Sequence, residues 1–367
     1  MQRMKYRILV IFILLLSALA QAQNPRVTLW TGFDQLILKY AALTNTVAVS
    51  GANLELRLAD NQKTGLLETG QIAGRFDTVV LSWNAVTPDK TSLQIEARAK
   101  VAGVWTKYYK IALWTTDTSL EKQSFSAQAD QFGQVETDTL KLKAFAEALQ
   151  IKVIFSSIKT GISPSLFGLA AVMSDSTQHQ NVLPKSLDKT AWGLDLPVPA
   201  RSQMIYPNGG SVWCSPTSTT MLLEYWSAKL GRKLSDSVPT AARAVWDTTY
   251  DGAGNWSFNM AYAGSKGLRA YVHRLSSLAQ AQKYIAQGIP LALSIAWKLG
   301  ALDGAALPSS NGHLVVLRGF TATGDPIIND PAAATDAAVR RVYKRAQLEK
   351  IWIEASGGIV YLIEAAK

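Results

Sequence analysis

Cysteine and histidine are both scarce in this chain. Cys214 is the single cysteine in 367 residues, and the three histidines are His179, His273 and His313. A lone cysteine excludes a disulfide within the chain. The scattered histidines offer no spacing typical of a zinc site, so we expect neither a metal nor a cofactor. Chemistry that needs a thiol or an imidazole therefore falls on very few residues.

Long apolar runs are absent after the first residues, and so are blocks of lysine and arginine. The net charge of +10 comes from 37 basic and 27 acidic residues that are spread along the chain, which argues against nucleic-acid binding. An apolar run at 8–16 follows a basic start and precedes Ala20-Gln21-Ala22, a pattern typical of a signal peptide over residues 1–22. We expect a secreted or periplasmic bacterial protein with no membrane span in its mature chain.

Residues 24–175 have the texture of β-structure. Apolar and polar residues alternate at 76–83, 92–98 and 110–114, with turn signals between them. Short alternating segments at this spacing predict an antiparallel all-β sandwich or jelly roll. Residues 141–157 carry both a helical and a strand pattern, and both readings stay open.

Aromatic residues are concentrated in the same region. Trp83, Trp105, Trp114 and the pair Tyr108-Tyr109 are candidates for a sugar-binding platform, and hence for contact with a glycan or a cell surface. Aromatic side chains more often fill the core of a β-sandwich, which we favour here.

The second half of the chain has a different pattern. Residues 176–194 are polar, contain Pro184 and predict a linker. Residues 195–367 predict an α+β domain in which helices come before strands. The expected helices span 216–229, with Gly231 as the stop, and 278–286; the expected strands span 289–295, 313–320, 326–329 and 359–363.

Cys214 falls at the expected start of the helix over 216–229. The free N–H groups and the positive dipole end of a helix N-terminus favour a thiolate and lower the thiol pKa. The position therefore suits a nucleophile. The alternative is a buried, inert thiol, since cysteine is among the most buried residue types.

A thiolate nucleophile needs a base, and His313 is the best placed candidate. His179 lies in the linker and His273 in an alternating stretch, whereas His313 opens an apolar strand behind a glycine. A hairpin about Thr323 would bring position 313 opposite positions near 330. Either Asn329 or Asp330 then orients the imidazole, but not both, because neighbouring residues of a strand point to opposite faces.

Three motifs in this order resemble a known family. They are CSPTS at 214–218, GHLVVL at 312–317 followed by Gly319-Phe320, and NDP at 329–331. They are similar to the motifs of the bacteriocin-processing, double-glycine cysteine peptidases and their secreted papain-like relatives, over about residues 195–367. The resemblance implies a papain-like fold, a triad of Cys214, His313 and Asp330, and a glutamine in the oxyanion hole. Gln203 fits that role, although it lies further from Cys214 than in the family; Asn208 is closer and also offers a donor.

Two functions from different classes follow. The first is an exported cysteine peptidase that cuts a peptide or protein substrate through a thioester acyl-enzyme. The second is a catalytically inactive surface or glycan-binding protein on a papain-like scaffold. A cell-wall amidase is a variant of the first, but the third residue of such enzymes is often a histidine, and none follows His313.

Overall fold

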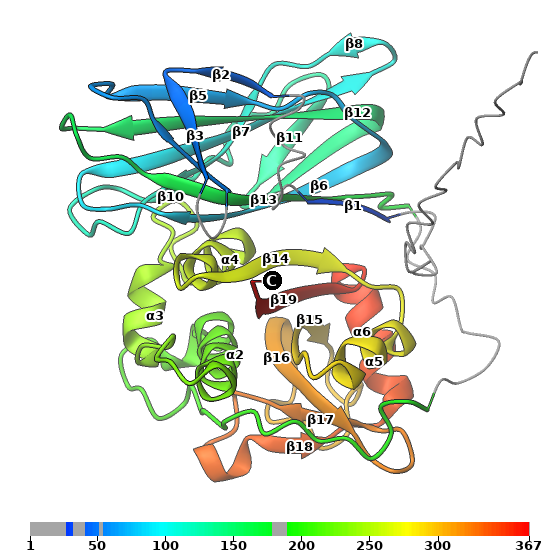
Figure 1. Ribbon diagram of the computed structural model, residues 1–367. Helices are drawn as coiled ribbons and strands as arrows, with labels where there is room; N and C mark the ends of the chain where they lie inside the picture. The colour runs from blue at the N-terminus through cyan, green and yellow to red at the C-terminus, as the bar shows by residue number, and fades with distance from the viewer. Residues whose placement is uncertain (1–26, 32–40, 51–53, 178–188, 367) are drawn as a thin grey trace, which may run out of the picture.

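The computed structural model describes residues 27–31, 41–50, 54–177 and 189–366. The expected signal peptide at 1–22 and His179 lie outside these ranges, so the predictions made for them stay predictions. No helix among the described residues is long and apolar enough to cross a membrane. The chain forms a large β-rich N-terminal region and a C-terminal domain that holds every helix of the described ranges (Figure 1).

The described residues of the N-terminal region form one continuous antiparallel sheet of 13 strands. The all-β expectation for this region is confirmed, while the boundaries 24–175 and 195–367 stay predictions. The strands are β1 (Val27–Thr31), β2 (Ala42–Thr44), β3 (Thr46–Ser50), β4 (Leu54–Leu58), β5 (Thr64–Glu68), β6 (Ile72–Val86), β7 (Thr91–Val101), β8 (Val104–Trp105), β9 (Tyr109–Trp114), β10 (Gln123–Ser124), β11 (Gly133–Glu136), β12 (Thr139–Ser157) and β13 (Ser165–Ser174).

Strand β12 holds this sheet together. It is 19 residues long and settles the ambiguity at 141–157 in favour of a strand. One of its edges pairs with β11 and then β7, and the other pairs with β6 and then β5. Its second half alternates strictly between buried and half-buried residues, which is the period of a strand and not of a helix.

The aromatic residues divide between core and surface. Trp83, Trp114 and Tyr109 are fully buried, so the core reading holds for them. Trp105 and Tyr108 are half-buried, but the guanidinium of Arg98 lies 4.8 Å and 4.6 Å from the centres of their rings. Cations thus already occupy ring faces on which a sugar would stack.

The C-terminal domain is built on a six-stranded sheet in the order β14-β19-β15-β16-β17-β18. Figure 1 shows α2 on one face of this sheet and α5 and α6 on the other. The expected α+β character is confirmed. The helices are α2 (Cys214–Leu230), α3 (Val238–Ala244), α4 (Trp256–Ser265), α5 (Leu278–Ala286) and α6 (Arg345–Ser356), with short 3-10 turns η1 (Gly210–Val212) and η2 (Asp336–Ala338); the strands are β14 (Leu268–Arg274), β15 (Leu291–Trp297), β16 (Ser310–Phe320), β17 (Pro326–Asn329), β18 (Arg340–Val342) and β19 (Ile359–Ala365).

The two regions share a buried interface in which β6 covers the edge strand β14 (Figure 1). The side chain of Asn84 pairs with Ala270 like a neighbouring strand: its Nδ2 donates to the carbonyl at 2.7 Å, and its Oδ1 accepts the N–H at 3.1 Å. Ser82 Oγ accepts the N–H of Val272 at 2.9 Å. Two polar side chains therefore satisfy backbone groups that an open sheet edge would expose.

Candidate active site

Cys214 is the first residue of α2, as the sequence predicts for a position at the helix start. Cys214 is a free cysteine, and the residue as a whole is half-buried. Two hydroxyls of the same helix tie it to the sheet: Ser218 Oγ donates to the carbonyl of Leu314 at 3.0 Å, and Ser215 Oγ lies 2.7 Å from the hydroxyl of Tyr361. These bonds fix the helix start beside the residue that follows His313.

His313 and Asp330 form a buried pair next to this thiol. His313 Nε2 lies 2.8 Å from Asp330 Oδ1, and the two residues are 2% and 0% exposed. The Asp330 carboxylate also accepts the Tyr343 hydroxyl at 2.5 Å and the Ala332 N–H at 2.9 Å. Because Nε2 is engaged by Asp330, Nδ1 is the ring nitrogen left to interact with Cys214, and His313 and Cys214 each shift the pKa of the other.

Asn329 lies on the other side of the strand. Its Nδ2 donates to the carbonyl of Pro199 at 3.1 Å, and its Oδ1 accepts from Arg318 Nη1 at 3.2 Å. It pairs with Val316 in the register of β16 and β17. Asp330, one residue on, falls on the opposite face, which is the face of His313. The structure thus brings Asp330, and not Asn329, to the imidazole.

The charges of the site reinforce one another. Burial raises the pKa of the Cys214 thiol, but the hydrogen bond and charge of His313, with the N–H groups of Leu314 and Ser215, bring it below its ordinary value. Burial lowers the pKa of His313, yet Asp330 and then Cys214 raise it to about 10. The arrangement favours a thiolate beside an imidazolium at neutral pH.

Trp297 covers the imidazole and is a residue that the sequence analysis missed. Its ring lies 5.7 Å from the His313 ring in an edge-on arrangement, and it is 5% exposed. Trp297 is the last residue of β15, which pairs with β16, the strand that carries His313. This position was the one signal that could have singled it out. A shielded imidazole–carboxylate bond is stronger, because water and its high dielectric constant are kept away.

Gln203 and Asn208 differ in their surroundings. Gln203 is 1% exposed, and its backbone N–H donates at 2.8 Å to the carbonyl of Pro331, directly after Asp330. Its Oε1 has no hydrogen-bond partner among the described residues. Asn208 is exposed. Tight turns take up the long separation in sequence between Gln203 and Cys214. They bring Gly210 so close to Gln203 that a Cβ at position 210 would lie 2.1 Å from the Gln203 carbonyl oxygen.

The remaining candidates lie apart from this cluster. His273 is buried in β14, where burial and Arg274 lower its pKa to about 4. Among the described residues, no group of three or more His, Cys, Asp or Glu side chains is arranged to hold a metal ion.

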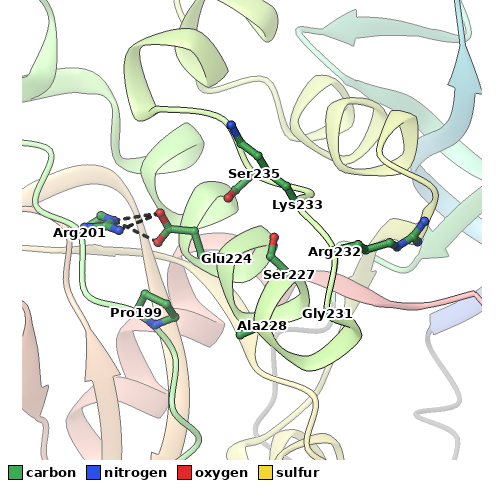
Figure 2. Close-up of a pocket in the computed structure, with 9 residues that line it drawn as sticks. All are labelled: Pro199, Arg201, Glu224, Ser227, Ala228, Gly231, Arg232, Lys233 and Ser235. Atoms are coloured by element: carbon green, nitrogen blue, oxygen red, sulfur yellow. Dashed lines mark hydrogen bonds and ion pairs between the residues drawn. The ribbon is translucent and has the colours of Figure 1, made fainter.

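A surface hollow of about 510 Å³ lies along the C-terminal half of α2 and the loop after it, and its lining does not include Cys214 (Figure 2). Arg201 lies at one side of the hollow and donates from Nε to both carboxylate oxygens of Glu224 at 3.0 Å (Figure 2). Of the four charged side chains in the lining of the hollow, Arg201 and Glu224 pair with each other, whereas Arg232 donates to the carbonyl of Gly267.

Comparison with known proteins agrees with this arrangement. Residues 195–360 match the model of the Peptidase_C39 like family, and residues 66–174 match the model of a Peptidase C39 N-terminal domain. The chain resembles the C39 peptidases. The family resemblance predicted from the three motifs is thereby confirmed, and the N-terminal match extends it to a region for which the sequence analysis named no family.

Solved structures are more distant. A crystal structure described as a C39-like peptidase from Bacillus anthracis is 15% identical, covers 47% of this chain and 98% of its own, and has a TM-score of 0.31. A mutant of a carbohydrate binding module family 29 (7% identity, 43% of this chain, 100% of its own, TM-score 0.23) and TmCBM61 in complex with β-1,4-galactotriose (6%, 40%, 88%, 0.20) also match. TM-scores this low do not establish a shared fold. No curated protein sequence matches the chain.

Proposed function

We propose that this C39-like protein is a cysteine peptidase in which Cys214 is the nucleophile, His313 the acid–base and Asp330 its orienter. The observation that carries the proposal is the placement of His313 between the lone thiol and a buried carboxylate. An inert thiol would need neither the imidazole nor the carboxylate. The geometry follows the logic of a catalytic triad.

The first half of the reaction forms a thioester. The Cys214 thiolate attacks the carbonyl carbon of the scissile peptide bond, a C–S bond forms, and the carbonyl electrons move to the oxygen. The Cys214 N–H and the Gln203 side-chain amide are the donors proposed for this oxyanion. When the carbonyl reforms, the C–N bond breaks and His313 Nδ1 gives its proton to the leaving amine.

The second half releases the acid. Water attacks the thioester carbonyl while neutral His313 takes one of its protons, and the C–S bond breaks to regenerate the thiolate and the imidazolium. Asp330 keeps Nε2–H engaged through both halves, so the ring does not rotate away from the thiol. Tyr343 and the Ala332 N–H hold the carboxylate itself.

The other functions have less support. Three of the five aromatic residues of the candidate sugar platform are buried, and Arg98 covers the remaining two. Glycan contact and export therefore rest on the sequence patterns alone. A cell-wall amidase would use the same nucleophile and base, and the presence of Asp330 in the third position favours the peptidase.

The test is hydrolysis of a fluorogenic peptide library, followed by mass spectrometry of the rapidly quenched enzyme. The proposal expects peptide turnover and an acyl adduct on Cys214. In Gln203→Ala, kcat falls on the order of a hundredfold, whereas Asn208→Ala stays close to wild type. Hydrolysis of cell-wall muropeptides with no turnover of peptides would instead establish the amidase.

A further inference from the structure

Tyr250 stands in a turn whose shape is adapted to its ring. The turn runs over 247–252 between α3 and α4, and Tyr250 is 50% exposed. A Cβ on Gly252 would lie 3.0 Å from Tyr250 Cε1, and a Cβ on Gly254 would lie 3.1 Å from its hydroxyl. The two glycines therefore let the ring lie flat over the turn, with one side open to solvent.

Asp247, the first residue of this turn, is fully buried and links the turn to the N-terminal region. Asp247 Oδ1 accepts the N–H groups of Thr249 at 3.1 Å, of Tyr250 at 3.2 Å, and of Ser124 in β10 at 2.9 Å. The Thr248 N–H donates to the carbonyl of Lys122 at 3.2 Å. The turn is thus bonded to β10, which stands at one end of the strand order of the N-terminal sheet.

A second clamp from the N-terminal region holds the segment after the turn. Asp138 Oδ2 accepts the N–H of Trp256, the first residue of α4, at 2.6 Å. A carboxylate at a helix N-terminus interacts favourably with the helix dipole. Burial raises the pKa of Asp138 to about 6, against the opposing effect of the Trp256 N–H.

The other side of the segment is fixed to the helix of the nucleophile. Asn259 Oδ1 accepts the hydroxyl of Thr219, on α2, at 3.1 Å. Its Nδ2 donates to the carbonyls of Ala253 at 2.9 Å and Asn255 at 2.8 Å. Burial and then the negative charge of Cys214 raise the pKa of Tyr250, which agrees with a ring within electrostatic range of the thiolate.

We propose that Tyr250 is a substrate-positioning residue of the peptidase site and that the N-terminal region is the part of the protein that holds it there. This inference rests on the proposed function. The open ring face, with the partly exposed Trp246 ring next to the turn, suits a peptide that carries an apolar side chain beside the scissile bond. The N-terminal region is then a component of the active site and not a separate binding module.

The first experiment compares steady-state kinetics with alkylation of Cys214 by iodoacetamide, a probe too small to need Tyr250. The substrates are two peptides that the wild type hydrolyses, with leucine or glycine beside the scissile bond. Tyr250→Ala should raise KM for the leucine peptide about tenfold or more, leave kcat nearly unchanged, and narrow the preference over glycine. Tyr250→Phe, which keeps the ring, should resemble wild type, and alkylation should change less than about twofold in both.

The second experiment tests the clamp. Ser124→Pro removes the N–H that Asp247 accepts, and Asp138→Asn removes the charge at α4. Both should reproduce the KM effect of Tyr250→Ala and speed amide hydrogen exchange over 247–256. Asp130→Asn is the matched control, because Asp130 accepts N–H groups of Phe132 and Gly133 elsewhere in the N-terminal region.

The outcomes separate the two claims. A wild-type protein that hydrolyses no peptide overturns the proposed function. A wild type that hydrolyses peptides while Tyr250→Ala keeps KM and the leucine preference overturns the inference alone. Equal losses in kcat and in the alkylation rate would also overturn it, because Tyr250 would then act on the nucleophile. If amide hydrogen exchange over 247–256 is unchanged in both Ser124→Pro and Asp138→Asn, the N-terminal region does not hold the turn in place.

Discussion

Two histidines of the C-terminal sheet are buried to a similar degree and have opposite electrostatics. His273 in β14 is 7% exposed and His313 in β16 is 2% exposed. Burial lowers the pKa of both imidazoles. Beside Arg274, the pKa of His273 falls to about 4, whereas Asp330 and Cys214 raise that of His313 to about 10. The charged neighbour, and not the depth of burial, decides which histidine is a cation at neutral pH.

Replacing each histidine in turn should give the largest difference. We expect His313→Ala to lower kcat/KM for peptide hydrolysis about a thousandfold or more, because the nucleophile loses its acid–base. His273→Ala, far from the thiol, should keep most of the activity of the folded protein. Steady-state kinetics on both variants checks this, and comparable losses in both would contradict the assignment of the base.

Removing the Asp330 carboxylate should lower the pKa of His313 toward that of His273. In Asp330→Asn the opposite charge is lost, so the pKa of His313 should fall and the alkaline limb of the pH profile of kcat/KM should move to lower pH. We expect a loss on the order of a hundredfold at neutral pH. A profile with an unmoved alkaline limb would show that Asp330 does not set the charge of the imidazole.

Acid should lower the stability of the folded protein through the protonation of His273. Its pKa is about 4 in the folded protein against 6.5 ordinarily, so between these values the unfolded chain binds more protons. Stability from this group is therefore present above pH 6.5 and is lost as the pH falls, by about 3 kcal/mol in total.

His273→Gln removes this titration. The free energy of unfolding of the wild type should decrease more steeply below pH 6.5 than that of the variant, as measured by urea denaturation at several pH values. Asp138, whose raised pKa acts in the opposite direction, is common to both proteins and cancels in the difference. Parallel curves would contradict a neutral, buried His273.

The smallest effect concerns the interface at β14, the strand that carries His273. Asn84→Ala leaves the N–H and carbonyl of Ala270 without their partner. We expect a loss of about 1–3 kcal/mol in the free energy of unfolding, and a pKa of His273 closer to its ordinary value as water reaches β14. Denaturation and NMR titration of the variant measure the two changes, and an unchanged pKa would show that other groups bury this histidine.

Much of the C-terminal domain was predictable because its elements carry clear local signals. The helix over 278–286 was predicted with the bounds that the structure has, and Gly231, with a φ of 64°, ends α2 as expected. Helix α4 was missed because residues 257–264 are all buried, so no polar face marks a helical period. The contact between the two regions depends on single side chains such as Asn84, which no periodicity reveals.

The candidate site was predictable for a different reason. Scarcity singled out Cys214, and strand order singled out His313. Asn329 and Asp330 stayed open because a register shift between Leu317 and Gly319 decides which positions face each other. Trp297 was missed, since it reaches His313 through a tertiary contact alone. The structure brings the three predicted side chains together, and their catalytic roles stay a prediction.

Nitrogen-15 NMR of the histidine rings at pH 7, in the protein with a free Cys214, directly reports the charge of His313. We predict two protonated ring nitrogens in His313, in an ion pair with a thiolate, and a neutral ring in His273. A His313 ring that is neutral at this pH, like the ring of His273, would contradict the thiolate–imidazolium pair on which the proposed peptidase depends.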